Sequence, residues 1–250
     1  MLQSVEFKGI ILFSKDYKEK DRLVKIFTEH AGKMMFFARN VQRKNNPLKQ
    51  AIINFHYGTY MGKLQKDSLS FLNGVKTVDA FLQIQTDIFL NAFATYILSL
   101  VDAALEDNEY DPSLYGFTKQ SLQLIDQGYD AQVITNIFEL QILSRFGVQL
   151  NLYSCAICGR VQEKFAFSSY MSGIVCTKHR LQDKTLYKAS PQIIHFARMF
   201  SNIHLNQIRS INISDETKQE LRVFIDALYD EYVGIKLKSK KFLDQMKDWT

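Results

Sequence analysis

The chain of 250 residues is 46% hydrophobic and contains only three prolines, which indicates a helix-rich protein with a sizeable core. Its net charge of +5 is uneven, because residues 1–80 carry 14 Lys and Arg against 7 Asp and Glu, and the rest carry 17 against 19. The first apolar run is too short for a signal peptide, and the longest one is interrupted by polar residues, so we expect a cytoplasmic protein and neither export nor a bilayer span.

Residues 1–80 have the pattern of short strands with alternating apolar residues. Gly32 marks the turn of a hairpin, and the pair Asn73-Gly74 is a further tight-turn signal. The strand candidates are residues 5–13, 22–41 (a hairpin), 51–63 and 68–81. Five glycine-punctuated strands in so short a segment predict a small closed barrel of the OB type. Its positive charge favours a polyanion-binding module, and the alternative is that the lysines only keep a β domain soluble.

From about residue 81 the hydrophobic period becomes that of helices. Residues 81–105 are apolar all round, which predicts a central buried helix. The further helix candidates are residues 113–126 and 131–147 and the segments that begin at Ser190-Pro191 and at Ser214. The predicted fold class is therefore α+β: a barrel domain over residues 1–80 and a helical domain over residues 81–250, with an inserted zinc-binding segment over residues 151–181.

All three cysteines lie in that inserted segment. They form the pattern Cys155-x2-Cys158, seventeen residues, then Cys176-x2-His179. Two short chelating pairs at this spacing predict a tetrahedral zinc site with Cys155, Cys158, Cys176 and His179 as ligands, and the residues between them have room for a hairpin.

Other roles for the cysteines explain less of the pattern. A disulfide would leave one cysteine over, and a redox Cys-x-x-Cys would leave the second pair unexplained. The imidazole ligand favours zinc over an iron–sulfur cluster. A catalytic zinc keeps an open position, whereas four protein ligands close the shell, and the His-x-Glu of the zinc deaminases is absent. The pattern therefore predicts one structural Zn2+.

The order of these parts resembles the bacterial recombination mediator family RecO over the whole chain. In that family the opening strand leads into a charged loop, which GIILFSKDYKEKDRLVKIFTEHAGK matches, and ARNVQRKNNPLKQ matches the basic run after the third strand. The family's zinc signature commonly has four cysteines, and here His179 takes the fourth place.

The resemblance implies a protein of DNA repair and homologous recombination in a RecFOR-type pathway. Such a protein binds single- and double-stranded DNA and anneals complementary strands. With RecR it helps to load RecA onto DNA coated by single-strand-binding protein. The resemblance also implies a cytoplasmic, nucleoid-associated location and no covalent chemistry. The sequence shows no catalytic constellation either, so we do not expect an enzyme.

A basic groove on the barrel would attract the phosphate backbone without sequence preference. The candidate phosphate contacts are Lys15, Lys18, Lys20, Arg22, Lys33, Arg39, Arg43, Lys44 and Lys49. Phe37, Tyr57 and Tyr60 are candidates for base stacking, with core packing as the alternative. The resemblance also implies docking of the acidic C-terminal tail of single-strand-binding protein, for which Arg198 and Arg209 are candidate charge partners.

Two rival functions remain open at this stage. One is an OB-fold RNA-binding protein with a structural zinc site, which would prefer structured RNA over single-stranded DNA. The other is a zinc-dependent enzyme, which would need an open ligand position and a nearby carboxylate.

Overall fold

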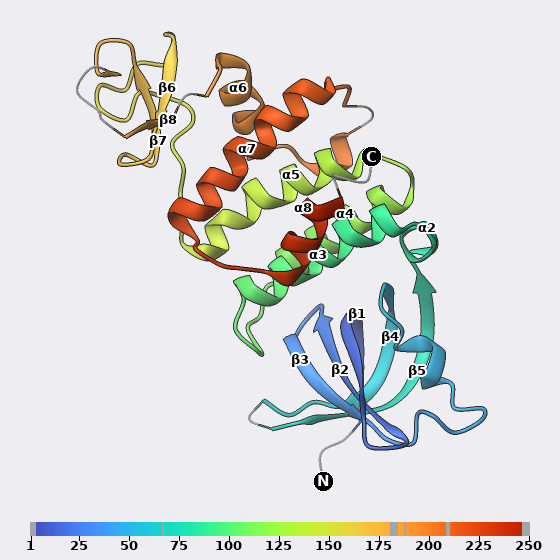
Figure 1. Cartoon of the computed structure of the whole chain (residues 1–250). Coiled ribbons are helices and arrows are strands. Elements are labelled where there is room, and N and C mark those ends of the chain that lie inside the picture. The colour runs from blue at the N-terminus through green and yellow to red at the C-terminus, as the bar shows by residue number, and fades with distance from the viewer. Residues whose placement is uncertain (1–3, 67, 181–184, 188, 209–210, 247–250) are drawn as a thin grey trace. The chain divides into compact units, whose positions relative to one another are not determined.

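The computed structural model describes residues 4–66, 68–180, 185–187, 189–208 and 211–246 (Figure 1). They form two compact units, one of residues 1–128 with 239–250 and the other of residues 129–238. The fold class predicted from the sequence is confirmed: a closed five-stranded barrel precedes the helices. The predicted domain boundary near residue 81 stays a prediction. Within the described ranges, no helix is long and apolar enough to cross a bilayer.

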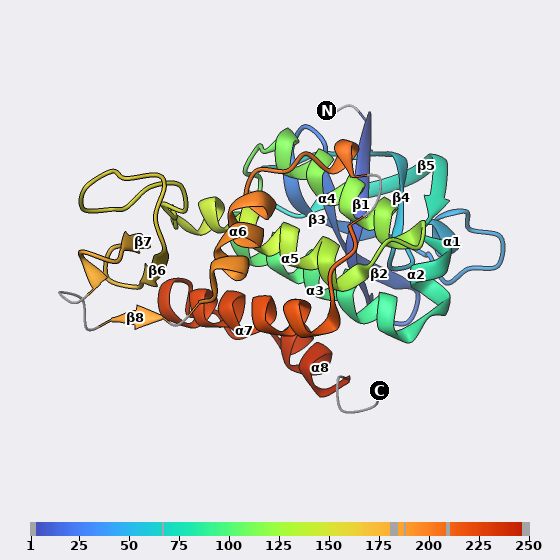
Figure 2. The same cartoon turned by 90° about the horizontal axis from the view of Figure 1, so that it is seen from above.

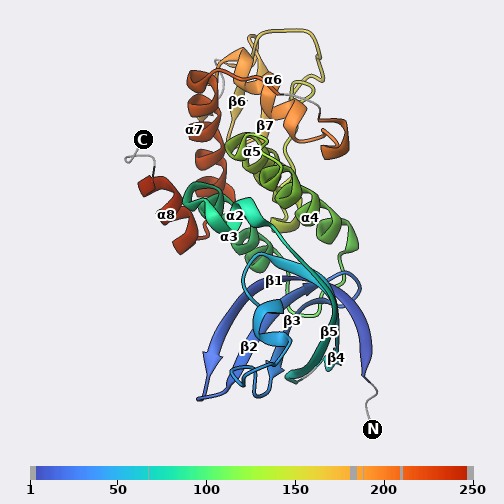
Figure 3. The ribbon, with the colours of Figure 1, turned by 90° about the vertical axis from the view of Figure 1, so that its right-hand side faces the viewer.

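The first unit opens with the barrel (Figure 3). Its strands are β1 (Val5–Tyr17), β2 (Asp21–Thr28), β3 (Gly32–Ala38), β4 (His56–Lys63) and β5 (Ser70–Ala80), with the short helix α1 (Leu48–Ala51) between β3 and β4. They close in the order β1-β2-β3-β5-β4, in which β3 and β5 run parallel and the other pairs antiparallel. As predicted, Gly32 turns the β2–β3 hairpin, with a left-handed φ of 69° that glycine adopts without strain.

Alternation along each strand puts one set of side chains inside the barrel. Val24, Ile26, Phe36 and Tyr60 are fully buried there. Phe7 stacks on Phe36 with ring centroids 5.0 Å apart. The opposite set of side chains points outward, and those that the rest of the first unit does not cover are accessible to a ligand.

The tight turn predicted at Asn73-Gly74 is wrong. Both residues lie inside β5, and Gly74 faces Met61 of β4 next to an irregularity in the register. A Cβ on Gly74 would come within 2.8 Å of the Met61 Cε, so glycine here leaves room for the end of the Met61 side chain.

Helices complete the first unit. They are α2 (Leu82–Thr86), α3 (Ile88–Ala104), α4 (Pro112–Asp126) and, from the C-terminal end of the chain, α8 (Lys238–Met246), whose first residue belongs to the second unit. The single helix predicted over 81–105 is divided at Asp87. The backbone of Asp87 is extended, which interrupts the helix, and its carboxylate caps the N-terminus of α3 by accepting from the Phe89 and Leu90 amides.

The second unit contains the remaining helices and a small sheet (Figure 2). Its elements are α5 (Ala131–Ile142), the 3-10 turn η1 (Leu143–Phe146), β6 (Phe165–Ser168), β7 (Gly173–Cys176), β8 (Leu186–Tyr187), α6 (Pro191–Phe200), the 3-10 turn η3 (Leu205–Gln207) and α7 (Asp215–Tyr232). The sheet has the order β7-β6-β8. Ser190 and Ser214 cap α6 and α7 as predicted. The predicted hairpin between the two cysteine pairs is β6–β7.

Candidate metal centre and nucleic-acid interface

Two tight turns bring the four metal-ligand candidates together. The first turn precedes β6, and the Gly159 amide closes it by donating to the Cys155 carbonyl at 2.9 Å. The second begins at Cys176, the last residue of β7, and the His179 amide donates to the Cys176 carbonyl at 3.0 Å. Because β6 and β7 form one hairpin, the two turns face each other.

The spacing of the ligand atoms fits a tetrahedral metal. The four atoms all lie within 4.8 Å of one another. His179 Nδ1 is 3.5 Å from Cys155 Sγ and 3.4 Å from Cys176 Sγ, and the Sγ atoms of Cys158 and Cys176 are 3.8 Å apart. A tetrahedron with bonds of about 2.3 Å to sulfur and about 2.0–2.1 Å to nitrogen has edges of about 3.5–3.8 Å. Three of the distances match these edges, so the cluster could hold a metal ion.

The environment of the cluster also favours a bound cation. Burial raises the pKa of the Cys155 thiol, but the backbone amides of Cys176, Cys158 and Ile157 outweigh it and lower that pKa to about 6. At Cys158 the Arg160 amide lowers the pKa, whereas desolvation and the sulfurs of Cys155 and Cys176 raise it overall. One thiolate thus forms readily, and a second is disfavoured until a cation compensates the charge.

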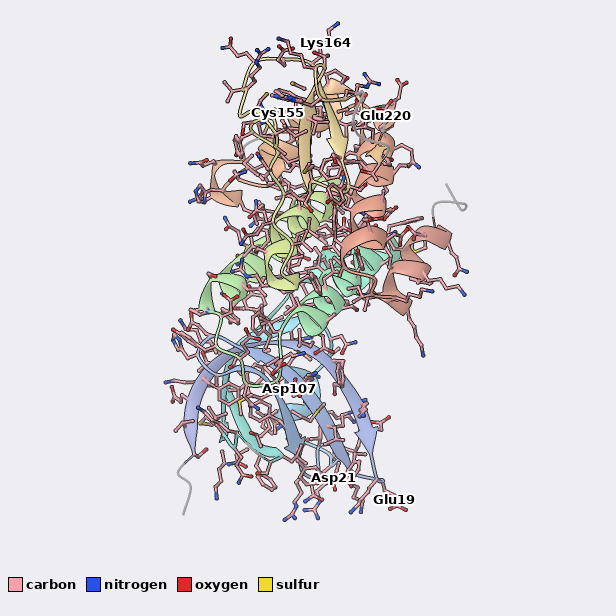
Figure 4. All side chains as sticks on the ribbon, turned by 90° about the vertical axis from the view of Figure 1, so that its left-hand side faces the viewer. Glu19, Asp21, Asp107, Cys155, Lys164 and Glu220 are labelled. Atoms are coloured by element: carbon pink, nitrogen blue, oxygen red, sulfur yellow. The ribbon has the colours of Figure 1, made fainter. Side chains whose placement is uncertain are left out.

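Eight of the nine predicted phosphate contacts lie at the barrel surface. Lys15 is exposed near the end of β1, and Lys18 and Lys20 are exposed in the turn that follows, where Figure 4 labels Glu19 and Asp21. Arg22 is half-buried and pairs with Asp16 at 2.9 Å. The others are exposed in α1 and the segment before it: Arg39, Arg43, Lys44 and Lys49. Their role in DNA binding stays a prediction.

The prediction for Lys33 is wrong. Its side chain is only 6% exposed, and its ammonium lies 3.1 Å from the Asp102 carboxylate and 3.6 Å from Asp107 (labelled in Figure 4). Lys25 joins the same cluster at 2.6 Å from Asp102. A phosphate cannot reach an ammonium that is buried against α3 and the loop after it, so Lys33 is a structural residue.

The predicted stacking residues separate in the same way. Tyr60 is fully buried, and its hydroxyl donates to the Ala51 carbonyl at 2.9 Å, so it belongs to the core. Tyr57 is half-buried and stacks on Phe81 at 4.6 Å. Phe37 lies on the outer face, where it makes edge contacts with Tyr17 at 5.9 Å and with Phe71 at 6.1 Å.

Strand register explains why the rings of Phe37 and Phe71 meet. Phe37 of β3 faces Leu23 of β2 on one side and Phe71 of β5 on the other. The same row continues to Lys15 of β1 and to Lys63 of β4. We call this row, with the adjacent Tyr17, the aromatic row. Tyr17 is 41% exposed and Phe71 is 38% exposed, so the rings are accessible between two lysines.

Of the two arginines predicted to bind an acidic tail, Arg198 already contacts other residues of the chain and Arg209 lies outside the described ranges. The Arg198 Nε donates to the Leu152 carbonyl at 2.7 Å, and its guanidinium lies over the Tyr153 ring at 5.5 Å. Arg209 lies outside the described residues. A groove of about 490 Å3 opens beside α6 and α7, but its rim carries Glu216 and Glu220.

Comparison with known proteins gives a consistent result over the whole chain. The family model for the N-terminal part of recombination protein O matches residues 1–81, and the model for its C-terminal part matches residues 85–241. A protein of Enterococcus faecalis named DNA repair protein RecO is 53% identical over 98% of this chain and 93% of its own length. Proteins of the same name from Lactococcus lactis subsp. cremoris and Streptococcus suis are 47% and 42% identical over 99% of this chain and over 98% and 95% of their own lengths.

Proposed function

The chain belongs to the RecO family of DNA repair and recombination proteins, and from that premise we propose that it binds single- and double-stranded DNA and anneals complementary strands. With RecR it would help to load RecA onto DNA coated by single-strand-binding protein, whose acidic tail it would bind. This role needs no covalent chemistry, so we propose no enzymatic activity. The aromatic row is the observation that carries the DNA-binding proposal.

The row offers both parts of a single-strand site. Bases stack on aromatic rings whatever their sequence, and cations beside the rings hold the backbone. Tyr17, Phe37 and Phe71 supply rings, and Lys15 and Lys63 lie at the two ends of the register. The ammonium of Lys18 lies 5.4 Å from the centre of the Tyr17 ring, which adds a further cation beside the row. An exposed cluster of rings is costly in water, and stacked bases would cover it.

For the metal we propose one structural Zn2+. Three sulfurs and an imidazole are a common zinc-binding set, and the spacing of their atoms fits that ion. When bound, zinc would keep all three thiols deprotonated and tie the two turns of the β6–β7 hairpin together. Cys155, Cys158, Cys176 and His179 would fill its coordination shell, which supports a structural role.

The DNA-binding proposal is tested by removing the two exposed rings of the row. The Tyr17→Ala, Phe71→Ala double variant should bind a labelled oligothymidine at least about tenfold more weakly, because each stacked base contributes roughly 1–3 kcal/mol. It should also anneal oligonucleotides coated with single-strand-binding protein more slowly, as measured by fluorescence quenching between the two strands.

A matched control removes two other exposed apolar side chains of the same unit. Leu82 of α2 and Ile88 of α3 are 63% and 54% exposed. The Leu82→Ala, Ile88→Ala variant should bind and anneal as the wild type does. If both variants bind oligothymidine equally well, the aromatic row is not the DNA site. A preference of the wild type for structured RNA would favour the alternative, an OB-fold RNA-binding protein.

A further inference from the structure

The metal segment carries its own concentration of positive charge. Between Cys155 and Arg180 there is a single carboxylate, Glu163, whereas four basic side chains are present and all of them are exposed. These are Arg160, Lys164, Lys178 and Arg180, which we call the basic rim. None of them is a candidate metal ligand, and the metal does not explain why they are there.

Local contacts gather the rim at the metal end of the hairpin. Glu163 accepts from Arg160 of the first turn at 3.1 Å and from the Thr177 hydroxyl of the second turn at 3.2 Å. Phe165 pairs with Cys176 across the hairpin, so Lys164 and Thr177 come next to each other, with Lys178 adjacent. Figure 4 shows Lys164 at the outer edge of this segment, beyond Cys155.

Apolar side chains accompany these cations. On the first turn, Ile157 is 43% exposed and Val161 is 62% exposed. Exposed apolar atoms beside several cations are a surface that sugars and base faces can contact while phosphates contact the ammonium groups.

We propose that the basic rim is a second nucleic-acid site, which binds the phosphate backbone of another strand while the barrel holds the first. The inference rests on the proposed DNA-binding function and names where the second strand binds. Annealing requires two polyanionic strands to approach each other against their electrostatic repulsion. Cations on both units of one chain would lower that repulsion.

An acidic peptide fits the second unit less well. Such a ligand with an apolar anchor needs an apolar pocket rimmed by positive charge. The described groove of this unit has an apolar floor that includes Ile193 and Phe224, but Glu216 and Glu220 lie on its rim. The basic rim is instead exposed on two turns, which suits an extended backbone better than a buried anchor.

The test measures whether one protein holds two strands. Two non-complementary oligonucleotides, one with a donor dye and one with an acceptor, are mixed with the full chain, and energy transfer between them is recorded against salt. The Lys164→Gln, Lys178→Gln variant should bind the first strand as the wild type does. Its slope of log affinity against log salt for the second strand should be flatter by about 1.4, because each single-strand phosphate that a lysine neutralises adds about 0.7 to the slope.

A control variant and metal analysis keep the result interpretable. Lys236 and Lys238 are exposed lysines of the same unit, and the Lys236→Gln, Lys238→Gln variant should leave transfer unchanged. Equal metal content in all samples shows that the two turns are intact.

Three results would overturn the proposal. The first is unchanged transfer in the Lys164→Gln, Lys178→Gln variant, as expected if two barrels of an oligomer bridge the strands. The second is loss of binding to an oligo-glutamate peptide without any loss of DNA bridging. The third is complete loss of second-strand binding when only the aromatic row is changed. A wild type that binds no DNA at all would instead contradict the proposed function itself.

Discussion

At the residue scale, the role of a lysine in this protein depends on which partner the fold brings to it. Lys15 and Lys33 are both basic residues of the barrel strands, but Lys33 meets Asp102 from α3, 69 positions away in the chain. The cluster of Lys25, Lys33, Asp102 and Asp107 fixes α3 and the following loop against β2 and β3. The buried ammonium groups of Lys25 and Lys33 are stable in their charged form because these carboxylates compensate their charge.

The Asp102→Asn substitution should therefore destabilise the first unit. Removing one partner of a fully buried ion pair costs roughly 3–5 kcal/mol. The Asp102 side chain is 34% exposed and Asp107 stays near both lysines, so the loss should be smaller than that. Chemical denaturation at neutral pH measures it. The exposed Asp79 provides the control, because Asp79→Asn should have little effect.

The loss of stability caused by Asp102→Asn should depend on pH. Burial raises the pKa of Asp102, but hydrogen bonds from Lys25 and Lys33 outweigh it, so the pKa lies below its ordinary value. The stabilising contribution is thus present above the unfolded pKa of about 3.9 and is lost as pH falls through the lower folded value. The difference in stability between wild type and variant should shrink in acid, and a constant difference down to about pH 2 would contradict this account.

The two candidate sites differ in how much of them the sequence could predict. The metal ligands form two pairs with local spacing, so the pattern alone brought all four together. The aromatic row depends on the parallel pairing of β3 with β5, which places Phe37 beside Phe71. No local signal reports that register, and for this reason the sequence does not indicate Phe71 as a stacking residue.

At the element scale, the signals that worked are those that act within one turn of chain. Serine caps and the Gly32 turn satisfy local backbone groups, so their positions follow from the sequence. By contrast, α8 was not predicted. One of the bonds that hold α7 against α5 is a buried ion pair between Arg222 and Glu139, which the sequence does not indicate either. These two residues are 83 positions apart, and only the fold shows that they meet.

The segment before α1 should contribute measurably to DNA binding as one element. If four to six phosphates of a single strand are contacted, the slope of log affinity against log salt should be about −3 to −4. The Arg39→Gln, Arg43→Gln, Lys44→Gln variant removes three exposed cations. Its slope should be flatter by about 2, at about 0.7 for each phosphate that is no longer neutralised.

Lysines on the same barrel that already pair with glutamates serve as the control for this measurement. Lys8 lies 3.3 Å from Glu29, and Lys76 lies 2.9 Å from Glu6. The Lys8→Gln, Lys76→Gln variant should change the slope by less than about 0.7, the value for one phosphate. If the triple variant keeps the wild-type slope, DNA binds elsewhere on the protein.

At the scale of the whole molecule, the metal centre and the aromatic row belong to different compact units. Each unit has a buried core of its own, with Tyr60 and Phe36 in the barrel and Phe138 and Phe224 in the second unit. The four candidate metal ligands all lie in the second unit, and the hydrogen bonds that close their turns stay within it. Loss of the metal should therefore weaken one unit and spare the other.

Metal removal tests this separation and the identity of the ion together. Elemental analysis should find one zinc per chain, and a chelator or the Cys155→Ser substitution should remove it. Because metal binding is coupled to folding, amide hydrogen exchange should then accelerate in the described part of residues 150–180 and remain slow in the barrel strands. Single-strand affinity should persist, since the aromatic row is intact. If elemental analysis found no zinc in carefully purified protein, or if hydrogen exchange accelerated equally in β1–β5, the metal would not have this local structural role.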